Sequence, residues 1–312
     1  LLPIASKLLE KLVQQQLVAF LDEHNVLPPT QFAFRKDHST EDALVLLTDG
    51  VLTAKDSALP CCICLLDMSK AFDKVSHPTL LQDLFDIGVS GTALSWFANY
   101  LSHRTQQVRI GTQDGPCNAC TCGVPQGSVL GPILFSVYTR GIPEVAGDVP
   151  TVQFADDIGL YFSHRLPTEC SAALTRAVSA VADWLEDRNL ILNSTKSQVL
   201  SMHSEAIPVN CNGTSLPAAS TAKYLGVLLD SSLNWQKHVD SIAKKASQKI
   251  GALWRSRRAL SLKARTQFMK SIIMPDLLYG STAFFACLRQ EQVSRLQVLQ
   301  NRAARAVFGQ PP

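Results

Sequence analysis

The segment TVQFADDIGLYF, residues 151–162, decides the fold class of this chain. Two apolar runs flank Asp156 and Asp157, and this pattern predicts a tight antiparallel hairpin with both carboxylates at its tip. An isolated Asp-Asp pair is more often an ordinary surface turn than a functional site. The surrounding sequence therefore has to decide between the two interpretations.

A third carboxylate follows another predicted strand. Residues 61–66, CCICLL, form an unbroken apolar run typical of a buried strand, and Asp67 comes directly after it. Asp67, Asp156 and Asp157 are therefore expected at the edge of a dry sheet, where like charges repel one another. A pair of Mg²⁺ ions, which need several shared carboxylates and substrate phosphate oxygens, would offset that repulsion.

The segment GVPQGSVLGP, residues 123–132, predicts a ligand-facing turn before a helix over Ser128–Val137. Its glycines and Pro125 give a constrained backbone that a flat ligand can approach, and the free N–H groups of a helix start suit phosphate. The segment lacks the GK[ST] sequence of a P-loop, which argues against that type of nucleotide site.

Hydrophobic periodicity predicts the remaining elements. An amphipathic helix is expected over residues 4–22, and no internal repeat is present. Further helices are expected over residues 41–54, 78–85, 91–101, 168–188, 242–253, 263–273 and 293–307. Further strands are expected over residues 105–110, 117–122, 197–202 and 223–229.

The charge of the chain is unevenly distributed. Of its 312 residues, 46% are apolar and 18% charged, which suffices for a folded core, and the net charge is only +3. Residues 231–312 hold 14 Lys or Arg against three acidic residues, whereas residues 1–230 hold 15 basic and 23 acidic ones. A basic segment beside an acidic body indicates a polyanion-binding arm, with a solvated helical face as the plainer alternative.

Nine cysteines, an odd number, indicate reduced thiols and an intracellular location. Cys117 and Cys120 have the spacing that begins a zinc site, but no second pair follows, so we expect buried strand cysteines instead. No apolar run approaches the ~20 residues needed to cross a bilayer, so we expect no membrane segment.

Five segments together resemble a known family. LDMSKAFDKV, GVPQGSVLGP, FADD, LILNSTKS and KYLGVLLD occur in the order and spacing of reverse transcriptase motifs A to E. The chain resembles the reverse transcriptase domain of a non-LTR (LINE-type, jockey-like) retrotransposon, and the flanking segments QFAFRKDHST and SIIMPDLLYGSTAFFA add to this likeness.

The resemblance implies an α/β (α+β) right-hand polymerase fold with fingers, an antiparallel-sheet palm and a helical thumb. The implied fingers cover residues 1–60, with palm at 61–77, fingers and palm helices and strands at 78–122, palm again at 123–230, and the basic helical thumb at 231–312.

The resemblance also implies a reaction, RNA-directed DNA synthesis by two-metal-ion nucleotidyl transfer. Asp67, Asp156 and Asp157 would bind two Mg²⁺ ions, with Mn²⁺ as an alternative and the Met68 carbonyl as a further ligand. The metals would activate a primer 3′-hydroxyl and stabilise the departing pyrophosphate. The implied partners are an RNA template, a DNA primer or nicked target DNA, and dNTPs.

Four residues are implied at the nucleotide. Phe72 matches the aromatic steric gate that leaves no room for a 2′-hydroxyl, although it could be an ordinary core aromatic. Gln126 and Gly127 match the loop near the nascent base pair. Lys196 matches a lysine proposed to give a proton to pyrophosphate, with a simply solvated lysine as the alternative.

Other matched residues are implied around the nucleic acid. Arg35 would contact the triphosphate or template, or form a structural salt bridge. Tyr224, Leu225 and Gly226 match the turn called the primer grip, although Gly226 could be a strand bulge. Asp73 is expected to fix local structure rather than bind metal.

Some positions depart from the family pattern. Ala33 and Asp37 stand where related elements usually have glycine, and Phe154 replaces the commoner tyrosine. A catalytically inactive nucleic-acid-binding remnant of a retrotransposon polymerase is therefore the alternative function, and an RNA-dependent RNA polymerase is a third. The implied location is nucleus and cytoplasm, as a retrotransposon ribonucleoprotein.

Overall fold

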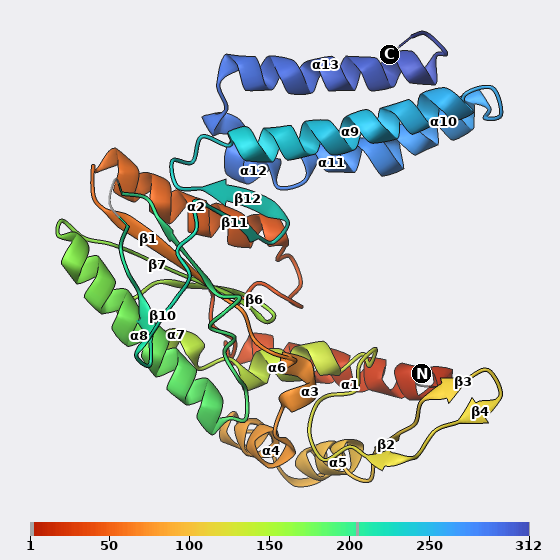
Figure 1. The fold of residues 1–312 in the computed structure, drawn as a ribbon. Helices are drawn as coiled ribbons and strands as arrows, with labels where there is room; N and C mark the ends of the chain where they lie inside the picture. Colours follow the sequence, from red (N-terminus) through yellow and green to blue (C-terminus); the bar gives the residue numbers. More distant parts are fainter. Residues whose placement is uncertain (1–2, 204–205, 312) are drawn as a thin grey trace.

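A four-stranded antiparallel sheet lies at the centre of the computed structural model, which describes residues 3–203 and 206–311. Its strand order is β6-β7-β1-β8, so the two strands nearest in sequence to the carboxylates, β1 and β7, are direct neighbours (Figure 1). The strands are β1 (Cys61–Leu66), β6 (Thr151–Phe154), β7 (Asp157–Ser163) and β8 (Gln198–Ser201). The predicted strand over residues 61–66 and the predicted hairpin over 151–162 are both confirmed.

The central strand β1 is buried on both faces, which explains its unbroken apolar sequence. Alternate residues enter two different cores. One face is covered by α8 (Pro167–Asp187) and the other by α2 (Thr40–Asp56). The residues on the α8 side are Cys62, Cys64 and Leu66, and those on the α2 side are Cys61, Ile63 and Leu65.

Three helices of the α8-side core match their predicted ranges to within one residue at each end: α1 (Ile4–Glu23), α4 (His77–Asp86) and α5 (Gly91–Leu101). This core also contains α6 (Gly131–Tyr138), which begins later than predicted, and two short helices that were not predicted, α3 (Ala71–Lys74) and α7 (Ile142–Val145). The apolar stripe of α1 is only partly used: Leu17 and Leu21 are buried, whereas its first half exposes Ile4, Leu8, Leu9 and Leu12.

The second core joins the sheet to the C-terminal helices. A hairpin of β11 (Thr221–Tyr224) and β12 (Val227–Asp230) leads into this part, in which α9 and α13 lie side by side (Figure 1). Its helices are α9 (Gln236–Ser256), α10 (Leu262–Phe268), a π-helical turn (Met269–Ile273), α11 (Met274–Leu278), α12 (Ser281–Phe284), a 3₁₀ turn (Phe285–Cys287) and α13 (Gln290–Val307).

Two predictions in this region were wrong in detail. The single strand predicted over 223–229 is a hairpin, because Leu225 and Gly226 both have positive φ (43° and 84°) and reverse the chain. The single helix predicted over 263–273 changes to π-helical geometry at Met269.

The segment between α5 and α6 forms small exposed ribbons instead of two full strands. β2 (Thr105–Gln106) pairs with β5 (Asn118–Ala119), and β3 (Arg109–Ile110) pairs with β4 (Gln113–Asp114). A further ribbon joins β9 (Asn210–Cys211) and β10 (Thr214–Ser215). The expectation of buried strand cysteines was wrong here, since Cys117 is exposed and Cys120 half-buried.

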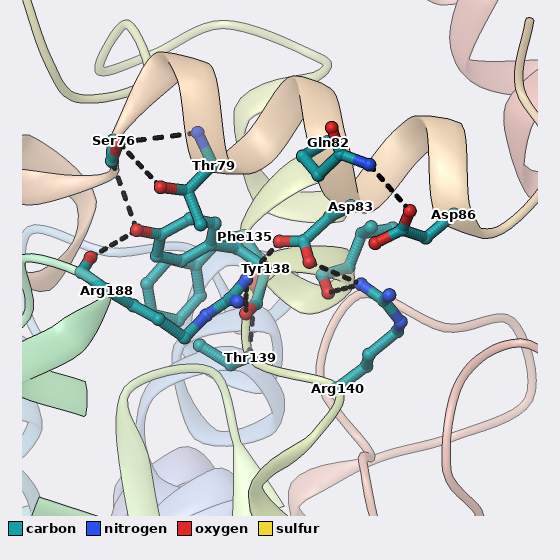
Figure 2. Close-up of polar contacts among 11 residues, drawn as sticks. Ser76, Thr79, Gln82, Asp83, Asp86, Phe135, Tyr138, Thr139, Arg140 and Arg188 are labelled. Atoms are coloured by element: carbon teal, nitrogen blue, oxygen red, sulfur yellow. Dashed lines mark hydrogen bonds and ion pairs between the residues drawn. The ribbon is translucent and has the colours of Figure 1, made fainter. Parts of the chain in front are cut away.

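A buried charged cluster ties α4 to the ends of α6 and α8 (Figure 2). The Asp83 carboxylate forms ion pairs with Arg188 and, at 3.1 Å, with Arg140. The pKa of Asp83 is raised by burial, an effect that both guanidinium groups oppose. The Arg188 guanidinium also lies 4.5 Å from the ring centroids of Tyr138 and Trp184, so the cluster fixes the end of α8.

In the part of the chain that the structure describes, no helix combines the length and the apolar character needed to cross a bilayer.

Candidate active site

The three predicted carboxylates meet at one edge of the sheet. β1 pairs with β7 as far as Leu66 opposite Ile158, and Asp67 and Asp157 are the next residues beyond that pair on each chain segment. β6 and β7 are joined through Ala155 and Asp156, which we call the palm turn; Phe154 and Asp157 close it as a pair. The structure thus brings together residues that are about 90 positions apart in the sequence.

The electrostatics of this edge follow from its geometry. Asp157 as a residue is exposed to solvent. The protein atoms around its carboxyl group nevertheless remove part of the water from that group, which disfavours the charged form. That burial raises the pKa of Asp157, and the negative charges of Asp156 and Asp67 raise it further. The Asp157 carboxylate therefore interacts with both of the others, and a bound cation would relieve this repulsion.

The donor atoms at this edge are oxygens, which suit a hard divalent cation. The backbone bridge between Met68 and Leu192 uses the Asp67 carbonyl and the Ser69 amide, so the Met68 carbonyl is outside that pairing. Within residues 3–203 and 206–311, no three His, Cys, Asp or Glu side chains converge closely enough to enclose a metal as they stand. The donor set fits Mg²⁺, and the carboxylate side chains would have to converge further on binding.

A serine that sequence reasoning missed holds Asp67 in place. The Ser197 hydroxyl accepts a hydrogen bond from the Asp67 amide (3.1 Å) and donates to the Asn193 carbonyl (2.8 Å). The Asn193 amide in turn donates to the Asp67 carbonyl at 2.7 Å. Lys196 lies in this same turn and is exposed. It directly precedes Ser197, the residue that holds the Asp67 backbone. The signal was available, because Ser197 ends the LILNSTKS segment.

Phe72 lies in a cluster of three aromatic rings. It is half-buried and stacks on the fully buried Phe135, with ring centroids 4.3 Å apart and an interplanar angle of 22°. Phe34, from the segment before α2, meets its ring edge-on at 6.3 Å. Phe72 is therefore a rigidly supported aromatic surface five residues after Asp67.

The glycine-rich loop packs against the segment that carries Phe72. The Val124 amide donates to the Phe72 carbonyl (2.9 Å), and a Cβ on Gly123 would lie 2.7 Å from the Asp73 carbonyl oxygen, so only glycine fits there. Gln126 donates through Nε2 to the Asp73 carboxylate at 2.9 Å. Asp73 therefore supports this loop, consistent with its expected structural role, and Gly127 is exposed with φ of 79°.

A buried glutamate from α1 anchors the far end of the same loop. The Glu10 carboxylate, 1% exposed, accepts hydrogen bonds from the Val129 amide (2.6 Å) and the Leu130 amide (3.3 Å). These amides immediately precede α6, which begins later than predicted, at Gly131. Sequence reasoning missed Glu10 because a lone glutamate in an amphipathic helix looks like a solvent-facing residue.

The segment that carries Arg35 runs beside β6. The Phe32 amide donates to the Gln153 carbonyl (2.9 Å), and Arg35 donates through Nη1 to the carbonyls of Pro28 (3.0 Å) and Gln31 (3.3 Å). Arg35 thus braces its own loop through backbone carbonyls. Asp37 has φ of 59°, so its position favours glycine, and aspartate is among the residues that tolerate this conformation.

The hairpin of β11 and β12 ends in Leu225 and Gly226, which we call the outer turn. The Tyr224 side chain points away from solvent: it is 3% exposed, and its hydroxyl donates to the Val152 carbonyl at 3.3 Å. Burial raises the pKa of Tyr224, with a smaller effect from the charge of Asp157. The exposed surface of this hairpin tip therefore belongs to Gly226 and, in part, Leu225.

Comparison with known proteins identifies the family. The sequence profile described as reverse transcriptase (RNA-dependent DNA polymerase) matches residues 1–229. The probable RNA-directed DNA polymerases from transposons BS and X-element of Drosophila melanogaster are 32% and 31% identical over 100% and 99% of the chain. The RNA-directed DNA polymerase from mobile element jockey of Drosophila funebris is 29% identical over 100% of it. The chain spans about a third of the length of these relatives (36%, 35% and 35%).

Solved structures agree on the fold. A truncated apo telomerase from Candida tropicalis superposes with a TM-score of 0.51 and 14% identity, covering 71% of this chain and 44% of that one. A telomerase from Candida albicans, in complex with a fragment of telomeric RNA, gives 0.50 and 13%, covering 96% and 52%. These likenesses confirm the right-hand polymerase fold. By its sequence profile and its relatives among mobile elements, the chain belongs to the reverse transcriptase family.

Proposed function

We propose that this chain is a catalytically competent RNA-directed DNA polymerase that extends a primer 3′-hydroxyl with dNTPs along an RNA template. The observation that carries the proposal is the meeting of Asp67, Asp156 and Asp157 at one edge of the sheet, in a chain of the reverse transcriptase family. The names of the relatives, RNA-directed DNA polymerases of mobile elements, support it.

The three carboxylates and the Met68 carbonyl are the residues that would hold two Mg²⁺ ions, with Mn²⁺ as an alternative. When bound, such ions supply a nucleophilic primer oxygen and offset charge on the departing pyrophosphate. The chain's own part is to fix the ligands: Ser197 holds the backbone of Asp67, and the paired strands hold the palm turn. The exposed Lys196 ammonium would give a proton to pyrophosphate.

Phe72 supports a preference for deoxynucleotides. Its ring is held from behind by Phe135 and at its edge by Phe34, so it cannot easily yield to a bulkier sugar. Gln126 and Gly127, on the loop that packs against Phe72, would face the base pair being formed, and Arg35 would lie on the triphosphate or template side. We expect Phe72→Val to raise rNTP incorporation relative to dNTP incorporation while leaving dNTP use largely intact.

Nucleic acid would bind across the outer turn and the basic C-terminal helices. Residues 231–312 carry 14 Lys or Arg against three acidic residues, which favours contact with phosphates of a primer–template duplex. Leu225 and Gly226 would touch the primer, which would be a DNA end or a nicked target. In cells, we propose a ribonucleoprotein that moves between cytoplasm and nucleus.

Primer extension tests this proposal. The purified chain is incubated with an RNA template, a DNA primer and Mg²⁺, with dNTPs in one arm and rNTPs in the other. Template-directed extension with dNTPs is the expected result. Extension with rNTPs at an equal rate would indicate an RNA polymerase, and salt-sensitive duplex binding with no incorporation would indicate the inactive remnant.

A further inference from the structure

Tyr279 links the C-terminal helices to α2 and to the outer turn. Tyr279 follows α11, and its hydroxyl donates to the Leu225 carbonyl at 2.7 Å. The same oxygen lies 3.2 Å from the Thr40 hydroxyl at the start of α2, which can donate to it in return. One side chain therefore links three segments that are 54 and 239 positions apart in the chain.

The ring of Tyr279 also packs on the outer turn. A Cβ added to Gly226 would lie 3.0 Å from Tyr279 Cε1, so the glycine allows the ring to sit against the turn backbone. Gly226 has φ of 84°, which already favours glycine. The ring and the hydroxyl thus hold the tip of the hairpin from two directions.

A glutamate beside Thr40 makes a second connection to the same place. The Glu41 carboxylate accepts from the Gly280 amide (3.3 Å) and from the Thr282 hydroxyl (2.8 Å). Gly280 has φ of 68°, and a Cβ there would lie 2.9 Å from Val227 Cγ2, next to the outer turn. The Gly280 amide and the Thr282 hydroxyl, both bonded to Glu41, therefore help to hold Tyr279 between α2 and the hairpin.

We propose that Tyr279 is a positioning residue for the primer, which fixes the outer turn relative to the fingers and the C-terminal helices. The proposal rests on the proposed function, in which Leu225 and Gly226 touch the primer. The hairpin has two strands only, and such a hairpin holds its tip weakly without outside contacts. The Tyr279 hydroxyl supplies such a contact, because it donates a hydrogen bond to the Leu225 carbonyl and so fixes the backbone of the turn.

Tyr279→Phe removes the hydroxyl and keeps the ring, which separates positioning from packing. Tyr161→Phe is the matched control, since it removes a half-buried tyrosine hydroxyl from β7, away from the outer turn. The measurements are the Kd of a fluorescent primer–template duplex, the KM for that duplex, the KM for dNTP and the thermal midpoint.

For Tyr279→Phe, we expect duplex Kd and KM to rise about fivefold, because the outer turn loses its hydrogen bond to this side chain, with the KM for dNTP unchanged. Thr40→Val should weaken duplex binding in the same direction and add little to Tyr279→Phe, because Tyr279→Phe already removes the hydrogen bond between Thr40 and Tyr279. Tyr161→Phe should match the wild-type chain.

One result overturns the proposal: a Tyr279→Phe variant with wild-type duplex Kd, whether or not its thermal midpoint falls. If the wild-type chain binds duplex but incorporates nothing, the catalytic proposal fails, and the Kd comparison still tests Tyr279. If the wild-type chain binds no duplex, both proposals fail together.

Discussion

The palm turn and the outer turn are both two-residue hairpin tips, but they are supported in different ways. The palm turn ends a strand pair inside the four-stranded sheet, where β7 is paired on both sides. The outer turn ends a two-stranded hairpin and depends on Tyr279 and, through it, on α2. The palm turn is thus held by strand pairing within the sheet, whereas the position of the outer turn depends on contacts with two other parts of the molecule.

Their backbones differ in where positive φ falls. In the palm turn Ala155 has φ of 57°, a conformation that costs a residue with a Cβ on the order of 1 kcal/mol and that a well-supported sheet can impose. In the outer turn two residues have positive φ: Leu225 (43°), which bears the same kind of cost, and Gly226 (84°), which adopts it without that cost. Each turn therefore holds one residue with a Cβ at positive φ, and the outer turn also depends on a glycine.

The largest expected effect is the loss of activity on changing the palm edge. Asp157→Asn should reduce nucleotide incorporation by at least about 100-fold, because one of the charges proposed to hold the metal ions is lost. The same change should stabilise the folded chain, because it removes a carboxylate whose charged form is disfavoured by burial and by repulsion from Asp156 and Asp67. Single-turnover kinetics and urea unfolding measure the two effects, with the exposed Asp187→Asn as control. A variant that is both active and less stable would contradict this account.

The next largest effect is expected at the Gln126 loop, which, unlike the palm turn, is held by a residue from a distant segment, Glu10 of α1. Glu10→Ala should cost about 2–3 kcal/mol of unfolding free energy, because the buried amides of Val129 and Leu130 lose their acceptor. Since these amides end the Gln126 loop, the KM for dNTP should rise as well. Glu23→Ala, at the exposed end of the same helix, is the control and should change neither quantity. An unchanged KM for dNTP would show that the loop keeps its position without Glu10.

The stability of the outer hairpin and that of the palm hairpin should change with pH in opposite directions. His238 lies behind the outer hairpin, where its Nδ1 accepts from the Leu228 amide (3.3 Å) and its ring meets Phe284 at 4.8 Å. Burial, with a smaller effect of Lys245, lowers the pKa of His238 from 6.5 to about 4. The unfolded chain therefore takes up a proton first as the pH falls from 6.5 to 4, and stability is lost at up to about 1.4 kcal/mol per pH unit.

Asp157 gives the opposite sign, because its pKa is raised in the folded chain and its cost to stability disappears as the pH falls. Hydrogen exchange of β12 and β7 amides between pH 6.5 and 4, corrected for the intrinsic exchange rate, measures the two regions separately. His238→Gln should flatten the loss of protection in β12 and leave β7 as it was. If the protection of β12 depends on pH equally in the wild-type chain and in His238→Gln, His238 is excluded as the cause.

The smallest effects come from exchanging the turn residues. Gly226→Ala should destabilise the chain by about 1–2 kcal/mol, because its φ is positive and its Cβ would approach the Tyr279 ring. Ala155→Gly should stay within about 0.5 kcal/mol of the wild-type chain, since relief of strain is offset by the greater freedom of glycine when unfolded. Thermal midpoints compare the two, and a larger loss for Ala155→Gly would reverse the contrast between the turns.

The sequence predicted the palm well because local pattern and tertiary environment agree there. β1 is apolar throughout because both its faces are buried, and Asp67 and Asp157 come together because they lie directly beyond the last residue pair of β1 and β7, Leu66 and Ile158. The same agreement made α5 and α8 easy to predict within one residue at each end.

The contacts that hold the loops could not be read from the sequence. Glu10, Ser197 and Tyr279 act on backbone groups 119, 130 and 54 positions away, and no local periodicity records such partners. The hydrophobic pattern predicted one strand across the outer turn because Leu225 is not a typical residue at positive φ, whereas the family resemblance implied a turn at Tyr224, Leu225 and Gly226.

The most direct test of the central claim compares the wild-type chain with Asp156→Asn on one primer–template duplex, by equilibrium binding and by RNA-templated extension with dNTPs and Mg²⁺. The account predicts equal duplex Kd for both, with template-directed extension by the wild-type chain alone. A wild-type chain that binds the duplex without adding a nucleotide, or an Asp156→Asn variant that extends the primer at the wild-type rate, would contradict it.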